Sequence, residues 1–351
     1  MPNNTTTFAH QINLSQHRAM VEDSGMICMG LGIDDPKSIF GTTMGLKETF
    51  SGQRIFDMPI AENGMTGIAI GAAIAGTRVL MTHQRVDFFL LAMDQLVNNA
   101  AKWHYMFNGQ MSVPITIRLI IGRGWGQGPT HQQSLQNWFC HIPGLKVITP
   151  GLTDNVGALL YQAIMDNNPT VFLEHRWLHN QNCQSCDCLP FDSKVNTTRV
   201  LRTGEDITLI ANSYLILEAI HAQEQLIDHG LSCDVIEVAE PTQIDWQTIY
   251  ASVNKTSKCL VMDIGHYAFS TASEITAMIS ENCFHRLTEP VQRMALPNYP
   301  EPTSFGLTGS YYLKSHQIVS KVAKITGLIS PPPPPSKILH DVPGDWFKGP
   351  F

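Results

Sequence analysis

The chain has 351 residues, of which 43% are hydrophobic and only 15% charged, and its formal net charge is -7. This length allows two domains of ordinary size, and the low charged fraction indicates that much of the surface is buried against other chains. The negative charge argues against nucleic acid as the main partner, and the absence of an apolar run of bilayer length argues against a membrane.

The cysteine usage and the first residues predict a location. Residues 1–11 are polar and lack the apolar core of a signal peptide, and the eight cysteines are scattered, mostly inside apolar segments. Such usage is typical of a reducing compartment. We therefore expect a cytoplasmic, oligomeric globular protein.

A single carboxylate stands in the small and apolar run at residues 59–76. This residue, Glu62, precedes Gly64, Gly67 and Gly71, whose spacing suits a helix that is thin on one side. An unpaired carboxylate in a dry environment is costly unless something binds it. The alternative is a carboxylate stabilised only by the N-terminal end of its helix.

Apolar strands and helical patterns then alternate. We expect strands at 79–82, 113–121, 146–148 and 170–174, and helices at 88–106 and 154–166. Alternation of this kind predicts a parallel sheet covered by helices on both faces. Residues 12–174 are therefore expected to form one doubly wound α/β domain.

A second alternation follows a polar break. Residues 175–204 are expected to be an interdomain linker, and 205–327 a second, smaller α/β domain. Its expected strands are 207–211, 233–238 and 259–263, and its expected helices 215–229 and 270–281. Residues 328–351 form a Pro-rich tail whose aromatic residues favour draping over a neighbouring subunit.

One cysteine cluster lies in the linker. Cys183, Cys186 and Cys188 follow His175 and His179. Structural zinc sites usually draw on two such clusters, so an ordinary loop is the default interpretation and a structural zinc the alternative.

Five blocks in one order resemble the beta subunit of thiamine-diphosphate-dependent 2-oxo acid dehydrogenases of the pyruvate and branched-chain type. They are Pro-Ile-Ala-Glu-Asn-Gly at 59–64 with the glycine run at 67–73, the stretch 94–102, Gly-Pro-Thr-His-Gln-Gln-Ser at 128–134, the stretch 143–150, and Asp-Asn-Asn-Pro at 166–169. The resemblance covers about residues 12–327. It implies a transketolase-like pyrimidine-binding domain followed by a transketolase C-terminal-type domain.

The resemblance also implies roles for particular residues. Glu62 would face N1′ of the aminopyrimidine of thiamine diphosphate and favour the 4′-imino tautomer that takes the C2 proton. Phe88 would pack on the pyrimidine ring, with Gln84 and Asp87 lining the same wall. His131 would handle the substrate carboxylate or a reaction proton.

Two ions belong to the implied site. The positions matching the family's structural potassium site are Ile115, Ala163, Ile164, Asp166 and Asn168, and oxygen ligands on a turn suit such a hard cation. The same segment also makes a good turn without an ion. The family binds the diphosphate through Mg²⁺ on a Gly-Asp-Gly motif, which this sequence lacks.

The missing motif implies a partner. A separate alpha subunit is expected to carry the Mg-diphosphate half of the site in an α2β2 assembly with beta–beta contacts, and a lipoyl acyltransferase is a further expected partner. The activity implied is oxidative decarboxylation of a 2-oxo acid with acyl transfer to lipoamide.

Departures from the family pattern keep alternatives open. Leu31 stands where the family usually has an acid, and the second domain has Asp263-Ile264-Gly265 in place of Glu-Gly-Gly. One alternative is a split transketolase-like carboligase or decarboxylase acting outside a lipoyl complex. Another is a non-catalytic partner that stabilises an alpha-like chain, against which the joint presence of Glu62, Phe88 and His131 argues.

Overall fold

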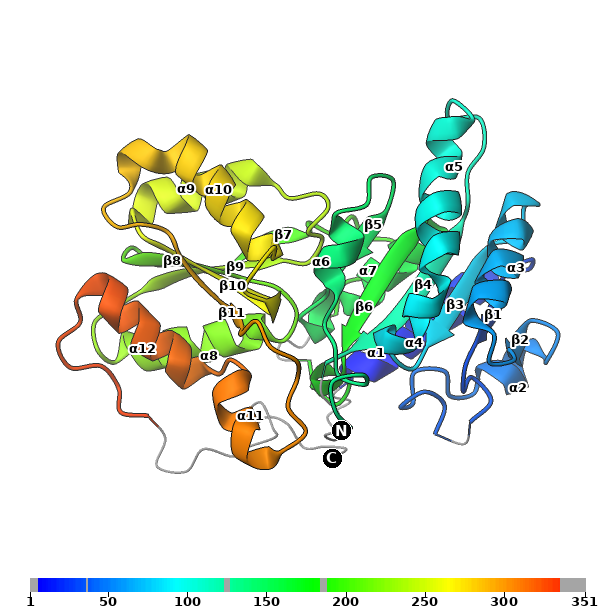
Figure 1. Cartoon of the computed structure of the whole chain (residues 1–351), viewed down its shortest axis with the longest axis horizontal. Helices are drawn as coiled ribbons and strands as arrows, with labels where there is room; N and C mark the ends of the chain where they lie inside the picture. Colours follow the sequence, from blue (N-terminus) through cyan, green and yellow to red (C-terminus); the bar gives the residue numbers. More distant parts are fainter. Residues whose placement is uncertain (1–5, 36, 123–126, 184–187, 335–351) are drawn as a thin grey trace. The chain divides into compact units, whose positions relative to one another are not determined.

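The computed structural model describes residues 6–35, 37–122, 127–183 and 188–334. The chain divides into two compact units, one comprising residues up to 122 together with 130–195, and the other residues from 196 onward with the short segment before 130. Each unit is built around one sheet (Figure 1). Within the described residues no helix combines the length and apolar character needed to cross a membrane.

The first unit contains a parallel sheet of six strands in the order β2-β1-β3-β4-β6-β5. The strands are β1 (Ile27–Gly30), β2 (Ile55–Asp57), β3 (Val79–His83), β4 (Ile115–Ile121), β5 (Lys146–Ile148) and β6 (Thr170–His175). Strands β3, β4 and β6 are buried along their whole length. Helices cover both faces of a sheet of this kind, which explains the near-continuous apolar runs.

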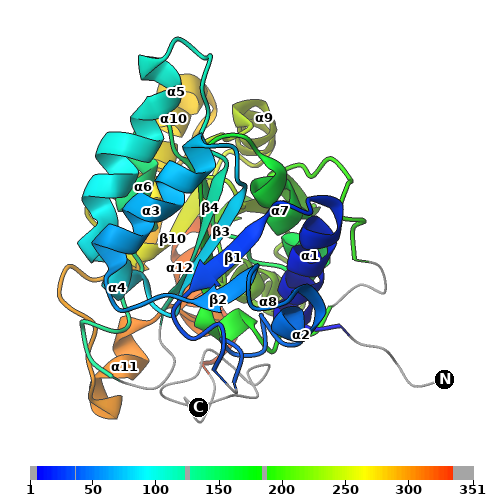
Figure 2. The ribbon, with the colours of Figure 1, turned by 90° about the vertical axis from the view of Figure 1, so that its right-hand side faces the viewer.

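Two layers of helices enclose this sheet (Figure 2). Helices α1 (Phe8–Glu22) and α7 (Thr153–Met165) pack together on one face, where the Thr116 hydroxyl of β4 donates to the Ala163 carbonyl of α7. The other layer contains α3 (Glu62–Ile74), α5 (Ala101–Met106) and α6 (Gln136–Cys140). Short elements complete the unit: α2 (Leu46–Phe50), α4 (Val86–Phe89), η1 (Leu90–Ala92), η2 (Gln95–Ala100) and η3 (Arg176–Leu178).

The second unit contains a five-stranded sheet in the order β11-β10-β8-β9-β7. Its strands are β7 (Thr198–Arg202), β8 (Ile207–Ala211), β9 (Cys233–Val238), β10 (Cys259–His266) and β11 (Gln292–Leu296), and only β7 runs antiparallel to its neighbour. Helices α9 (Trp246–Thr256) and α10 (Thr271–Cys283) pack on one face, and α8 (Leu215–Ile227) and α12 (Ser315–Thr326) on the other (Figure 1). The remaining elements are η4 (Phe284–Arg286) and α11 (Phe305–Tyr311).

The predicted fold class, two doubly wound α/β domains, is confirmed. Most expected strands and helices occur within a few residues of their expected bounds, but the helix expected at 88–106 is divided into four pieces, one of them the π-helix η2. The expected linker at 175–204 contains η3 and the edge strand β7. The four domain boundaries remain predictions, and most of the tail lies outside the described residues.

Candidate active site

The order of the strands marks one edge of the first sheet. The chain passes from β1 to β2 on one side and then returns to β3 on the other, so the order reverses between β1 and β3. In open parallel sheets, ligands bind beside the carboxyl ends of the strands at such a reversal. Glu62 and Gln84 both come from this edge, since α3 begins there and Gln84 directly follows β3.

Gln84 lies directly over the end of β1. Gly32, with a φ of +79°, leaves the space, because a Cβ atom there would come within 2.0 Å of the Gln84 amide nitrogen. A residue with a side chain could not adopt this conformation with Gln84 in place. The glycine therefore brings a polar side chain against the backbone at the reversal.

Glu62 is the first residue of α3 and is only 6% exposed. Its carboxylate makes no hydrogen bond or ion pair within the described residues. The preceding residue, Ala61, provides no side-chain cap. The N-terminal end of the helix stabilises a carboxylate at this position, and both carboxylate oxygens can still accept a hydrogen bond.

Three of the predicted site residues, Asp87, Phe88 and His131, make side-chain contacts beside this edge. The rings of Phe88 and His131 meet edge to face, with 5.5 Å between their centroids, and the Thr130 hydroxyl lies 3.0 Å from His131 Nδ1. The Asp87 carboxylate accepts a hydrogen bond of 2.6 Å from the Gln133 amide. These contacts bring residues more than forty positions apart in the sequence together to form one wall of the candidate site.

The residues flanking these pairs are buried. Gln132 and Ser134 lie on either side of Gln133, and both are nearly inaccessible to solvent. Arg85, next to Gln84, is also buried, and burial lowers the pKa of its guanidinium to about 10 while the charge of Asp87 opposes this shift. The wall therefore combines an aromatic pair with closely packed polar groups.

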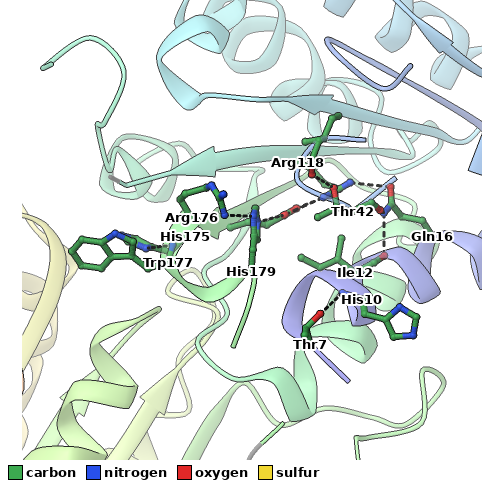
Figure 3. Close-up of polar contacts among 12 residues, drawn as sticks. Thr7, His10, Ile12, Gln16, Thr42, Arg118, His175, Arg176, Trp177 and His179 are labelled. Atoms are coloured by element: carbon green, nitrogen blue, oxygen red, sulfur yellow. Dashed lines mark hydrogen bonds and ion pairs between the residues drawn. The ribbon is translucent and has the colours of Figure 1, made fainter. Parts of the chain in front are cut away.

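A buried ion-pair network that the sequence analysis did not predict lies on the face of the sheet that α1 and α7 cover (Figure 3). Arg118 of β4 makes a bidentate pair with Glu174 of β6, with distances of 2.5 Å and 3.0 Å, and both side chains are inaccessible to solvent. The third guanidinium nitrogen donates to the Gln16 side chain, and Gln16 in turn donates to the Thr42 carbonyl. The network therefore connects two strands, helix α1 and the loop after β1.

His179 extends this network toward Arg176. Burial lowers the pKa of His179 to about 4 despite the opposing hydrogen bond to Glu174, so the ring is neutral. Its Nε2 lies 3.2 Å from Glu174 and its Nδ1 3.3 Å from an Arg176 nitrogen, which assigns the proton to Nε2. The Arg176 guanidinium in turn lies 4.0 Å above the centroid of the Phe40 ring.

Glu174 remains ionised in this setting. Burial by itself raises the pKa of the carboxyl, but the charge of Arg118 and the hydrogen bonds from His179 and Arg118 outweigh it, so the pKa lies below its ordinary value. The network is thus a satisfied ion pair that holds the sheet and its covering loop together. The sequence contained one signal for it, an arginine in the middle of the apolar strand at 115–121, which requires a buried partner.

Four of the five residues expected to bind potassium lie in the last turn of α7 or just after it, and the fifth, Ile115, begins β4. Arg78 donates to the carbonyl oxygens of Ile164 and Asp166 at 2.6 Å and 2.7 Å. The Ala163 carbonyl accepts from Thr116, and the Asp166 carboxylate accepts from the backbone of Asn168. Carbonyl oxygens have a second lone pair, so this oxygen-only set still fits a hard cation by its chemistry.

The cysteine cluster is only partly described. The Sγ atoms of Cys183 and Cys188 lie 3.5 Å apart, whereas Cys186 lies outside the described residues. The two histidines considered as zinc ligands are engaged elsewhere, His179 with Glu174 and His175 with the backbone of Trp177. Within the described part of the chain, no group of three or more potential metal-ligating side chains converges.

Comparison with known proteins identifies the family. The pyrimidine-binding domain of transketolase matches residues 11–181, and the transketolase C-terminal domain matches residues 196–318. The chain is 33% identical over 308 residues to the pyruvate dehydrogenase E1 component subunit beta-1 of Arabidopsis thaliana, covering 86% of this chain and 84% of the relative. It belongs to the E1 beta-subunit family of thiamine-diphosphate-dependent 2-oxo acid dehydrogenases.

The chain is also similar to a protein with a different name and to a solved structure. The beta subunit of the acetoin:2,6-dichlorophenolindophenol oxidoreductase of Bacillus subtilis is 30% identical over 328 residues, covering 90% of this chain and 96% of the relative. A solved structure described as a split-gene transketolase, inactive beta4 tetramer, superposes with a TM-score of 0.72 over 93% of this chain and 99% of its own, at 17% identity. That likeness concerns the fold alone. The predicted family and its enzyme class are thus confirmed.

Proposed function

We propose that this E1 beta subunit supplies the pyrimidine half of a thiamine diphosphate site for oxidative decarboxylation of a 2-oxo acid, with transfer of the acyl group to lipoamide. The observation that carries this proposal is the position of Glu62. Glu62 is 6% exposed, makes no hydrogen bond within the described residues, and begins α3 at the edge of the sheet where the strand order reverses. Such a group is ready to pair with a ring nitrogen.

The remaining predicted residues would serve the same ring. Thiamine diphosphate supplies a C2 carbanion when bound. Glu62 would hold a proton at N1′, the Phe88 ring would pack on the pyrimidine, and Gln84 and Asp87 would line the wall. His131, in contact with Phe88, would serve as a general acid or bind the substrate carboxylate.

A second subunit would complete the site. The sequence has no Gly-Asp-Gly motif for Mg²⁺ and a diphosphate, so an alpha subunit would hold both in an α2β2 assembly with beta–beta contacts. The curated relatives, named as beta subunits, support this arrangement. A lipoyl acyltransferase would accept the acyl group. A cytoplasmic location remains a prediction, and several relatives are mitochondrial proteins.

A structural potassium ion would bind at the turn after α7. The carbonyls of Ile115, Ala163 and Ile164, together with Asp166 and Asn168, would be its ligands. Because Arg78 already donates to two of these oxygens, the ion would share them with a guanidinium. It would therefore stabilise the turn less than it would a set of oxygens without a neighbouring positive charge.

Co-purification tests the proposal. The chain, tagged and expressed in its native source, should retain an alpha subunit with a Gly-Asp-Gly motif, and neither chain alone should decarboxylate a 2-oxo acid. In the complex, Glu62→Gln should abolish cofactor-dependent decarboxylation. Glu48→Gln, at an exposed position in the first turn of α2, should leave it unchanged. Full turnover by the isolated chain, or by the Glu62 variant complex, would refute the proposal.

A further inference from the structure

His83 is a fully buried histidine that the family resemblance does not use. It is the last residue of β3, and neither ring nitrogen has a hydrogen-bond partner. Its ring meets Phe89 edge to face, with 5.1 Å between centroids. Two buried nitrogens without partners cost stability that an apolar side chain of similar size would not.

The position of His83 in its strand fixes the face to which it points. Side chains alternate along a strand, so His83 shares a face with Met81. The Thr66 hydroxyl of α3 contacts the Met81 sulfur at 3.5 Å, which identifies this as the face that α3 covers (Figure 2). His83 therefore points toward the α3 layer and away from the Arg118 network.

The same contact gives the register between helix and strand. Helix α3 connects the parallel strands β2 and β3, so it runs antiparallel to both. One helical turn back from Thr66, about 6 Å, is Glu62. Two residues on from Met81, about 6.6 Å along the strand, is His83. Both steps lead toward the carboxyl edge of the sheet, so the two side chains lie at matching levels.

The hydrogen-bonding groups of the two side chains are complementary. Burial lowers the pKa of His83 to about 4, so the imidazole is neutral at neutral pH and has one N–H to donate. Glu62, which makes no hydrogen bond within the described residues, has only acceptors when ionised. A neutral donor can orient a carboxylate without replacing the ring nitrogen as the partner for its proton.

We propose that His83 is a positioning residue for Glu62: in the cofactor-bound site, its N–H donates to one carboxylate oxygen and leaves the other directed at the aminopyrimidine. This inference rests on the proposed function, because it assigns Glu62 to the pyrimidine. It explains why a histidine occupies an apolar site where its nitrogens have no other partner. The unpartnered nitrogens of His83 lower the stability of the free chain. In the cofactor-bound site, the hydrogen bond from His83 fixes the orientation of Glu62.

The test uses the two-subunit complex with thiamine diphosphate and Mg²⁺. Exchange of the C2 proton of the bound cofactor for deuterium reports on the orientation of Glu62 without turnover. His83→Phe should slow this exchange about 10- to 100-fold, the value of a hydrogen bond to a charged group. His83→Asn and His83→Gln place an amide N–H near the Nδ1 and Nε2 positions, and one of them should restore most of the rate.

A second readout needs no cofactor. His83→Phe removes two unpartnered nitrogens, so the thermal midpoint of the isolated chain should rise by about 2–6 °C. Thr82→Val is the matched control, because the Thr82 hydroxyl is also buried without a partner but points to the opposite face. It should leave the exchange rate within twofold of the wild type.

The outcomes separate the two proposals. Exchange in His83→Phe within twofold of the wild type would overturn the role of His83, as would a fall in the thermal midpoint of the isolated chain. If Glu62→Gln slows exchange, the double variant should be no slower than Glu62→Gln alone, and additive effects would again overturn the role of His83. If Glu62→Gln leaves exchange unchanged, the proposed function itself fails.

Discussion

Replacement of Glu174 by glutamine should strongly destabilise the first unit. The substitution preserves size but leaves the Arg118 guanidinium as a buried cation facing a neutral amide. Both side chains of the pair have 0% exposure. Breaking a buried pair by removing one charge costs about 3–5 kcal/mol, because the remaining charge stays desolvated.

This cost converts to a thermal shift. For units of 150–250 residues, each kcal/mol lowers the midpoint by about 2–4 °C, so Glu174→Gln should lower it by about 6–20 °C. Differential scanning calorimetry can follow the transition of the first unit. Lys47→Met provides the control, since the Lys47–Asp34 pair has side-chain exposures of 48% and 29% and exposed pairs contribute about 0–1 kcal/mol.

A double substitution separates the cost of an unpaired charge from the loss of the ion pair. Arg118→Met combined with Glu174→Leu removes both charges, and replacing a buried pair by apolar residues is often neutral or stabilising. The double variant should therefore recover most of the midpoint lost in Glu174→Gln. If Glu174→Gln costs no more than the Lys47 control, or if the double variant is worse than either single one, the pair does not have the role described.

Three further predictions follow from the same unit. Burial keeps the pKa of His83 and His179 at about 4 and that of His175 at about 3. As the pH falls below about 6.5, these histidines therefore bind protons in the unfolded chain but not in the folded one. Each of them should then lower the free energy of unfolding by about 1.4 kcal/mol per pH unit. The thermal midpoint should fall from pH 7.5 to 5.5, and an unchanged midpoint would contradict this. Gly122→Ala should cost about 1–3 kcal/mol more than Gly41→Ala in urea unfolding, because both have positive φ but only the Gly122 Cβ would meet another atom, His175 Nε2, at 2.1 Å. Finally, potassium chloride should raise the midpoint above that in choline chloride at equal ionic strength, and equal midpoints would exclude the proposed ion site.

The sheet of the first unit could be predicted because its long strands are buried on both faces. Apolar runs at 115–121 and 170–175 cannot belong to a half-exposed sheet, and the alternation with helices then fixes parallel strands. Strands β1 and β2 gave little signal, since they have four and three residues. Their place depends on pairing across long sequence separations.

The candidate site likewise contains one residue that the sequence reveals and several contacts that only the folded chain creates. Glu62 was recognisable because a lone carboxylate contrasts with its apolar neighbours. The contact of Phe88 with His131 and the pairing of Arg118 with Glu174 each join residues more than forty positions apart, and only the packed sheet brings them together. The role of His83 depends on strand register, which local pattern does not encode.

The loop after β1 contains three consecutive residues in the left-handed region, Ser38, Ile39 and Phe40, with φ of 47°, 45° and 60°. This conformation costs roughly 1–2 kcal/mol per residue, and for a β-branched residue such as Ile39 it is uncommon. The loop is held by Gln16, which binds the Thr42 carbonyl, and by the Arg176 contact with Phe40. These tertiary contacts hold the loop in a backbone conformation that its residues disfavour. The free energy needed to open the loop should therefore be well below that needed to unfold the sheet. In native-state hydrogen exchange, its amides should exchange as one early cooperative unit, while those of β3 and β4 report the global opening.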